Sequence, residues 1–427
     1  MTRFRLVTGR TFSSLRIRNY RLFFTGQLVS LTGTWMQIVA QGWLVLKLTG
    51  SGVALGLTTA LQFLPLLLFG VWGGVIADRF DKRRTLLWTQ TAAGTLALVL
   101  FAVVALDRVE LWMIYTIAFA LGCVTAIDNP TRQSFVTEMV GGDAVPNAIA
   151  LNSAAFNAAR LVGPAIAGIL IATVGIAPAF LVNGLSYVAV LIGLTRMTPA
   201  DLNRLEPAPR GRGQIRAGLH HAWSTPELRS TILLVAVVGT FGFNFVVVLP
   251  LLAKYTFDGG PALYGALSSV MAVGSLTGAL ATAGRGRPTR KWLLGTAVGF
   301  GVTALLAAAA PNPVVLGALL VPVGASMIAF IATANSTVQL HSDPALRGRV
   351  MALFVLVFLG STPLGGPVVG WLSDPRQFGP RAGLVVAGAS TLAAALTAIA
   401  FSRPWSQLRI SARPRPELHV HTERVAS

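Results

Sequence analysis

Residues 73–86 read GGVIADRFDKRRTL, and this stretch decides the fold because it separates two long apolar runs. The charged residues in it are Asp78, Arg79, Asp81, Lys82, Arg83 and Arg84, and Gly74 stands one helical turn before the first of them. Charged side chains are costly in the hydrocarbon core of a bilayer. The stretch is therefore predicted to be a short loop between two membrane helices, with Asp78 at the end of the first.

The composition points the same way. Of 427 residues, 54% are hydrophobic and 11% are charged, and the mean hydropathy is +0.68. Soluble domains carry about 25% charged residues, so this chain has too few to cover a soluble surface. The single cysteine, Cys123, excludes a disulfide framework and a cysteine-based zinc site. The five histidines lack metal-ligand spacing, and no Walker-type loop exists. We therefore expect no metal, no cofactor and no enzyme activity.

Runs of about 20 apolar residues are long enough to span a membrane as helices. They predict an all-α integral membrane fold of twelve helices in two bundles of six. The first bundle is expected over 22–195 and the second over 230–402, joined by a central linker, 196–229. A segment 1–21 precedes the bundles, and a basic tail, 403–427, follows them. The expected spans are 22–46, 53–77, 86–106, 111–135, 147–172, 176–195, 230–253, 262–283, 292–310, 313–339, 348–372 and 381–402.

The basic residues predict the topology. Of the 34 Lys and Arg, 28 fall on the side that holds both termini, loop 73–86 and the central linker. Cytoplasmic loops of membrane proteins carry this excess. Both termini are therefore expected in the cytoplasm of a bacterium, with the helices in its inner membrane and no cleaved signal peptide. The net charge of +19 is explained by topology and by contact with membrane lipids, and no nucleic-acid partner is expected.

The two halves repeat each other. Gly163-Pro164 in the fifth span corresponds to Gly366-Pro367 in the eleventh, and the loop 284–292 is basic like loop 73–86 but has no acidic residue. Glycine pairs four residues apart also occur at Gly70 and Gly74, at Gly274 and Gly278, and at Gly366 and Gly370. Small residues let membrane helices approach closely. We expect these glycines in the second, eighth and eleventh spans to line a seam between the halves, together with the fifth span.

Taken together, loop 73–86, the Gly163-Pro164 helix and the stretch 128–164 resemble the major facilitator superfamily. The resemblance is strongest to its efflux branch, which includes enterobactin exporters and macrolide efflux proteins. It implies alternating access, a monomer, a bulky amphipathic substrate and coupling to protons. It also implies a latch that closes the cytoplasmic side, formed by Gly74, Asp78, Arg79, Lys82, Arg83 and Glu138. Gly163, Pro164 and Gly168 match the antiporter signature of the superfamily. Asp81 departs from the pattern, because the family has glycine at that position.

Three ionisable residues fall inside predicted spans: Asp128, Arg132 and Arg160. Residues four apart share a helix face, so Asp128 and Arg132 can pair, and Arg160 on the next helix can compete for Asp128. Two interpretations stay open. Asp128 is either a proton-coupling site, tuned by the two arginines, or a permanently ionised structural partner.

The predicted cavity between the halves is amphipathic. Its candidate polar residues are Gln37, Gln41, Asn152, Asn157, Asn244, Asn335 and Gln339. Amides among aromatic residues favour neutral or weakly cationic substrates. The sequence is therefore interpreted as a secondary active exporter of a siderophore, antibiotic or drug. A lipid or lysolipid flippase of the same fold, and a membrane scaffold or sensor without transport, remain alternatives.

Overall fold

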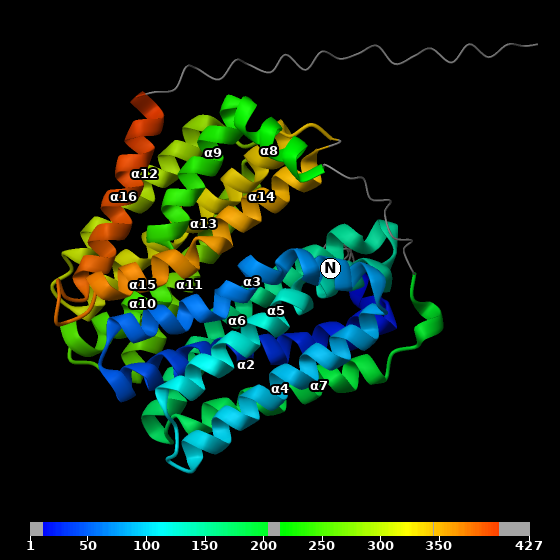
Figure 1. Ribbon diagram of the computed structural model, residues 1–427, viewed down its shortest axis with the longest axis horizontal. Helices are drawn as coiled ribbons and strands as arrows, with labels where there is room; N and C mark the ends of the chain where they lie inside the picture. The colour runs from blue at the N-terminus through cyan, green and yellow to red at the C-terminus, as the bar shows by residue number, and fades with distance from the viewer. Residues whose placement is uncertain (1–11, 204–213, 345, 401–427) are drawn as a thin grey trace, which may run out of the picture.

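The computed structural model describes residues 12–203, 214–344 and 346–400, apart from the side chains of 71 and 214–218. The described helices form two bundles (Figure 1). The first bundle contains α2 (Arg18–Thr49), α3 (Gly52–Arg79), α4 (Lys82–Ala105), α5 (Leu111–Val140), α6 (Val145–Thr173) and α7 (Ala177–Thr195). The second contains α9 (Pro226–Val237), α10 (Phe245–Leu251), α11 (Pro261–Gly284), α12 (Arg290–Ala308), α13 (Pro313–His341), α14 (Arg347–Gly360), α15 (Thr362–Leu372) and α16 (Arg381–Ala400).

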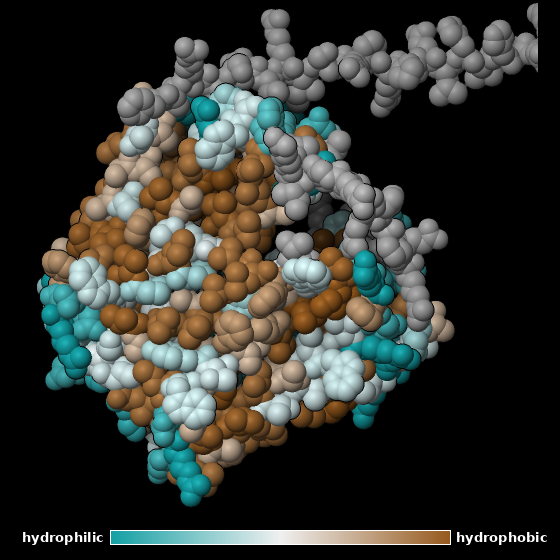
Figure 2. All heavy atoms as spheres, in the orientation of Figure 1, coloured by the Kyte–Doolittle hydropathy of each residue, from teal (hydrophilic) through white to brown (hydrophobic). Residues whose placement is uncertain are grey.

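The twelve-helix architecture is confirmed. Eleven helical segments of the described chain are long and apolar enough to cross a membrane. The twelfth helix, α2, is less apolar because it carries polar residues such as Gln27, Gln37 and Gln41, which lie buried inside the first bundle. Figure 2 shows apolar side chains over the middle of the visible face, with hydrophilic groups gathered at its edges.

Local sequence signals explain where the helices begin and end. Ser51 caps α3 by accepting hydrogen bonds from the backbone N–H of Val53 and Ala54. Asp81, the departure from the family pattern, caps α4 by accepting from the N–H of Arg84 at 2.9 Å. Gly50 ends α2 with φ +62°, a left-handed conformation that glycine adopts without strain. The connection between α3 and α4 is therefore only Phe80 and Asp81, shorter than the predicted loop 73–86, whose other residues belong to the two helices.

Two of the predicted spans are interrupted. The span expected at 230–253 contains two π-helical turns, η4 (Val238–Gly242) and η5 (Leu252–Thr256), on either side of α10. The span expected at 348–372 breaks at Ser361, between α14 and α15. Gly365 of α15 packs directly on the carbonyl of Thr240 in η4, so the two irregular helices meet where both depart from α-helical geometry. The predicted central linker also contains a helix, α8 (Gln214–Ser224).

The seam between the bundles is formed by two pairings, α3 with α15 and α6 with α11. These are the second, eleventh, fifth and eighth spans, so the expected seam helices are confirmed. The bundles meet at the end of the molecule that carries residues 49–52, 257–260 and 373–380, here called the loop-50 end. They separate toward the opposite end, which carries residues 80–81, 196–203 and 285–289 and is called the termini end (Figure 1). Figure 2 shows a hollow between the bundles on that side.

The seam glycines differ in part from those expected. Gly366 and Gly370 of α15 pack on the backbone of Gly56 and Gly52 of α3, and Gly168 of α6 packs on Gly265 of α11. The expectation for the other pairs is wrong. A Cβ at Gly74 would meet nothing within 4 Å, and one at Gly70 would meet only Leu66. Gly274 and Gly278 pack instead on the backbone of α13, inside the second bundle.

Candidate functional site

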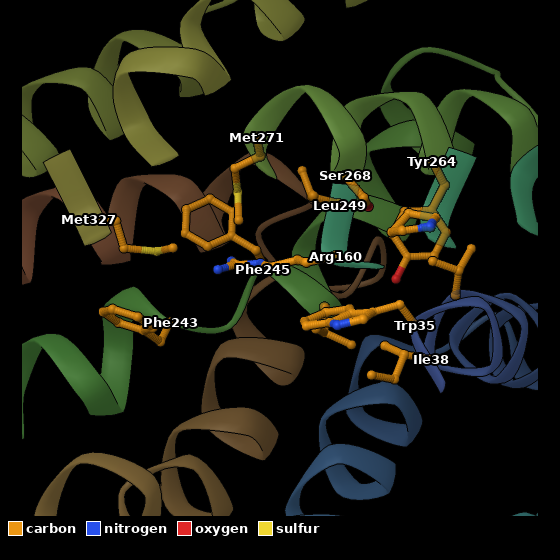
Figure 3. A pocket seen from close by; sticks show the side chains of 13 residues that line it. Trp35, Ile38, Arg160, Phe243, Phe245, Leu249, Tyr264, Ser268, Met271 and Met327 are labelled. Atoms are coloured by element: carbon orange, nitrogen blue, oxygen red, sulfur yellow. The ribbon is translucent and has the colours of Figure 1, made fainter. Parts of the chain in front are cut away.

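A cavity lies between the bundles at the centre of the molecule (Figure 3). Helices of both bundles contribute to its wall. The lining residues are Trp35, Ile38, Val39, Arg160, Pro164, Phe243, Phe245, Val246, Leu249, Tyr264, Ser268, Met271 and Met327. Its volume of about 90 Å³ is small beside the 300–1,000 Å³ of typical ligand sites, so in this state it is the narrow inner end of the space between the bundles.

Arg160 is the one charged residue in this lining. Its guanidinium carbon lies 5.6 Å from the centre of the Trp35 ring, within the range of a cation–π interaction. Figure 3 shows the Arg160 side chain reaching into the cavity between the rings of Trp35 and Phe245.

The local sequence explains this position. Gly163 lies one turn after Arg160, and a Cβ there would lie 2.6 Å from the Cβ of Trp35. The glycine thus lets α2 and α6 come close enough for the arginine to stack on the indole. The next residue, Pro164, has no N–H to donate to the carbonyl of Arg160 four residues earlier. The Gly163-Pro164 signature therefore shapes α6 at the point where its one charged side chain enters the cavity.

The amides predicted to line the cavity lie elsewhere. None of the seven belongs to the lining described above. Gln37 accepts a hydrogen bond from Asn183 at 2.6 Å inside the first bundle, Gln339 donates to Asn335 at 2.8 Å, and Asn157 donates to the carbonyl of Ser153 at 2.8 Å.

The other three amides, Asn152, Asn244 and Gln41, also lie outside the cavity lining. Asn152 lies 3.5 Å from the Tyr20 hydroxyl, Asn244 donates to the carbonyl of Thr240 at 2.7 Å, and Gln41 is buried in α2. Amides in apolar surroundings need hydrogen-bond partners, and six of the seven have at least one on their own or an adjacent helix, although Asn244 Oδ1 has none. None of the seven lines the cavity in this state, and their role in binding substrate stays a prediction.

Asp128 belongs to a separate polar cluster between α4 and α5. Its carboxylate is paired with Arg132 and accepts hydrogen bonds from Thr89 Oγ1 at 2.7 Å and Gln90 Nε2 at 2.8 Å. Asp128 is 3% exposed, and the expected pairing on one helix face is present. Arg160 does not take part, because it stacks on Trp35 instead. Two atoms of the cluster, Gln90 Oε1 and Arg132 Nε, are buried without a partner.

Three residues of the expected latch, Lys82, Arg83 and Glu138, make contacts within the first bundle. Lys82 Nζ lies 2.6 Å from Glu138 Oε1, which ties the start of α4 to the end of α5. Arg83 donates to the carbonyls of Leu194 and Thr195 at the end of α7, at 2.6 and 3.0 Å. Asp78 and Arg79 form the last turn of α3 beside them. Gly74 lies in open space, so the expected close approach to it is not present in this state.

A second set of charges, which the sequence interpretation missed, joins the bundles at the loop-50 end. Asp374 follows α15 and accepts hydrogen bonds from the backbone N–H of Gly52 at 2.8 Å and the hydroxyl of Ser51 at 3.0 Å. These residues begin α3, where a helix favours a negative charge. Lys254 donates to the carbonyl of Leu46 in the last turn of α2 at 3.2 Å, where a helix favours a positive charge.

Burial raises the pKa of Asp374, but the opposing influences are larger. The N–H groups of Arg376 and Gly52, the hydroxyl of Ser51 and the charge of Arg376 together place its pKa below the usual value. The carboxylate is 4% exposed. The only sequence signal that could have found it is the placement of an acid just after the apolar run of the eleventh span.

The comparisons with known proteins agree with this architecture. A family described as "transmembrane secretion effector", within the major facilitator superfamily, matches residues 9–425. A staphyloferrin A transporter of Staphylococcus aureus is 25% identical over 61% of this chain and 66% of its own. The multidrug efflux pump Tap of Mycolicibacterium fortuitum is 27% identical over 83% of this chain and 88% of its own.

Among solved structures, a bacterial homologue of the iron transporter ferroportin, in an inward-facing state, has a TM-score of 0.68. It is 16% identical, and the alignment covers 90% of this chain and 98% of that protein. This likeness concerns the fold. The expected resemblance to efflux members of the superfamily is confirmed by the family match and by the sequence relatives.

Proposed function

Since this chain belongs to the transmembrane secretion effector family of the major facilitator superfamily, we propose that it exports an amphipathic siderophore or drug by alternating access. The chain is a multi-pass membrane transporter of the efflux type, and the printed functions of its relatives, staphyloferrin A transport and multidrug efflux, suggest the two substrate classes. Secondary transporters of this kind bind substrate near the membrane midplane, between repeated halves.

One observation carries the proposal. The two bundles are joined at the loop-50 end by Asp374, Lys254 and the glycine contacts of α3 with α15, and they separate at the other end around a central cavity. A transporter that presents its cavity to one side at a time needs this asymmetry. With the termini in the cytoplasm, as the basic residues predict, this is the inward-open state.

Asp78 is the residue that would close the termini end in the outward-open state. It ends α3, and the antiparallel helix α14 begins at Arg347 at the same end of the molecule. When the bundles rock to close the termini end, the Asp78 carboxylate meets the start of α14, as Asp374 now meets the start of α3. Asp374 thus joins the bundles at the loop-50 end in the inward-open state, and Asp78 joins them at the termini end in the outward-open state.

Export would be coupled to proton entry, with Asp128 as the candidate carboxylate. In the present state Arg132, Thr89 and Gln90 surround it with donors. In this proposal the contacts around Asp128 change between the inward-open and outward-open states. If they stay in place, Asp128 serves as a structural partner of Arg132.

The test has two parts. A bacterial strain without its own broad-specificity pumps, carrying this protein, should accumulate less of at least one siderophore or drug from a panel than the same strain with Asp78→Ala. Equal accumulation across the panel contradicts export. For an exported compound, uptake into inverted vesicles under an imposed pH gradient should fall with Asp128→Asn but not with Asp143→Asn, an exposed control. Undiminished uptake by Asp128→Asn removes that residue from proton coupling.

A further inference from the structure

We infer that the central cavity selects an organic anion, an apolar body carrying a carboxylate or a similar charged oxygen group that pairs with Arg160. The inference deepens the proposed function and rests on it, because it names the substrate class of the same cavity. It also reverses the expectation of neutral or weakly cationic substrates, which relied on amides that do not line the cavity.

The charge of the cavity carries the argument. Its lining contains Arg160 and no Asp or Glu. The carboxylates of Asp128 and Glu138 are committed to Arg132 and Lys82. The contact described for Arg160 is the face of Trp35, and an aromatic face only partly compensates a cation removed from water. Within the described part of the chain, Arg160 therefore has no acidic partner at the centre of the transporter.

Such a charge is costly to keep without a function. An arginine at mid-membrane disfavours insertion of its helix, and such residues mark substrate pathways. A bound anion supplies the missing partner, whereas a cationic substrate would meet repulsion. The guanidinium fork is suited to a carboxylate because it donates two parallel hydrogen bonds.

The rest of the wall suits the apolar body of such a molecule. Phe243 and Phe245 present aromatic rings, and Met271 and Met327 present flexible thioether chains (Figure 3). Methionines adapt to ligands of different shape. The hydroxyls of Tyr264 and Ser268 are further polar groups of the lining, and both can donate to an anion. Selection by charge is therefore combined with tolerance of shape.

The test uses two probes of nearly equal shape, 1-naphthaleneacetate and neutral 1-naphthaleneacetamide. Equilibrium binding is measured at neutral pH on the full chain in phosphatidylcholine nanodiscs, with empty discs as blank. A hydrogen bond to a charged group contributes about 1.5–3 kcal/mol, so the acetate should bind about 10- to 150-fold more tightly. Arg160→Gln should abolish this preference. Arg285→Gln, which removes an exposed arginine stacked 3.7 Å from the centre of the Trp292 ring, should keep it.

Equal affinity for the two probes, binding of neither, or a preference that survives Arg160→Gln overturns the inference. If Arg160→Gln binds neither probe, Arg160→Lys decides: a retained preference for the acetate supports the inference, and its loss contradicts it. Discs that also contain phosphatidylglycerol should give the same acetate affinity. A lower affinity in those discs would show that the lipid headgroup competes for Arg160, and it would overturn the substrate assignment. An exporter that moves only neutral or cationic compounds would leave the proposed function standing and remove this inference alone.

Discussion

Replacing Asp374 with asparagine should open the loop-50 end. Asp374 joins the two bundles through the N–H of Gly52 and the hydroxyl of Ser51. Hydrogen bonds to a charged group contribute about 1.5–3 kcal/mol each and neutral ones about 0.5–1.5 kcal/mol. A carboxylate at a helix N-terminus adds about 0.3–1 kcal/mol. Asparagine keeps the size and one acceptor, so Asp374→Asn should weaken closure by about 1–3 kcal/mol.

This change shifts the ratio of open to closed molecules about 5- to 150-fold. If about 1% of the wild-type protein is open at that end, the variant should have about 5–60% open. Distances between spin labels measure the shift, in a Cys123→Ser background that frees the chain of its one native cysteine. Labels at exposed positions 108 and 377 report on the loop-50 end, and labels at 201 and 287 on the termini end.

The variant should show a longer distance across the loop-50 end and a shorter one across the termini end. Glu110→Gln is the matched control: Glu110 lies at the same end but accepts its hydrogen bond from Trp112 of its own bundle, at 2.8 Å. Distances in Asp374→Asn that equal those of the wild type would refute the reasoning. An equal shift in Glu110→Gln would do so as well, because it would make the effect nonspecific.

Three further outcomes are expected. The pKa of Asp374 is lowered in the closed state, so closure of the loop-50 end should be constant above the ordinary carboxyl pKa of about 4. Closure should weaken as the pH falls through the lowered pKa, and the same spin-label distances would show it. Asp374→Asn should lose this pH dependence. Gly56→Val should also lengthen the loop-50 distance, since a side chain there collides with α15, whereas Gly142→Val, in open space, should not. Lys82→Met should lower the thermal unfolding temperature in detergent, because it leaves the buried Glu138 carboxylate unpaired, at a cost in unfolding free energy of about 3–5 kcal/mol at most. Arg84→Met, a change at an exposed residue, should keep the unfolding free energy within about 0.5 kcal/mol of the wild type.

The helices and the seam could be predicted because they depend on local properties. Apolar length predicts a span, and the Gly366-Pro367 turn predicts close packing wherever α15 meets another backbone. The π-helical turns around α10 were not predictable in the same way. They accompany the contact of Gly365 with Thr240, 125 positions away in the chain, which no local pattern specifies.

In the candidate site, too, local sequence predicts some contacts, and others depend on residues far apart in the chain. The pairing of Asp128 with Arg132 follows from helical spacing, and the structure has it. Gln37 was misplaced because its partner, Asn183, is 146 residues away, and Asp374 was missed because its partner is the backbone of Gly52, 322 residues away. Arg160 was identified as an intramembrane charge, but its neighbour Trp35 comes from another helix. Residue type indicates which groups need a partner, whereas the identity of the partner depends on how the helices pack.

The central claim is that export requires the loop-50 end to open. Ser51 Oγ and Asp374 Oδ2 lie 3.0 Å apart across the two bundles, so cysteines at 51 and 374, in the Cys123→Ser background, are the pair to cross-link, with loss of free thiol showing that the disulfide has formed. The decisive measurement is the accumulation of an exported compound in cells that carry this double variant, before and after reduction. We expect oxidised cells to accumulate as much compound as cells without the protein, and reduction to restore export. Export that continues at full rate while the disulfide is complete would contradict the account.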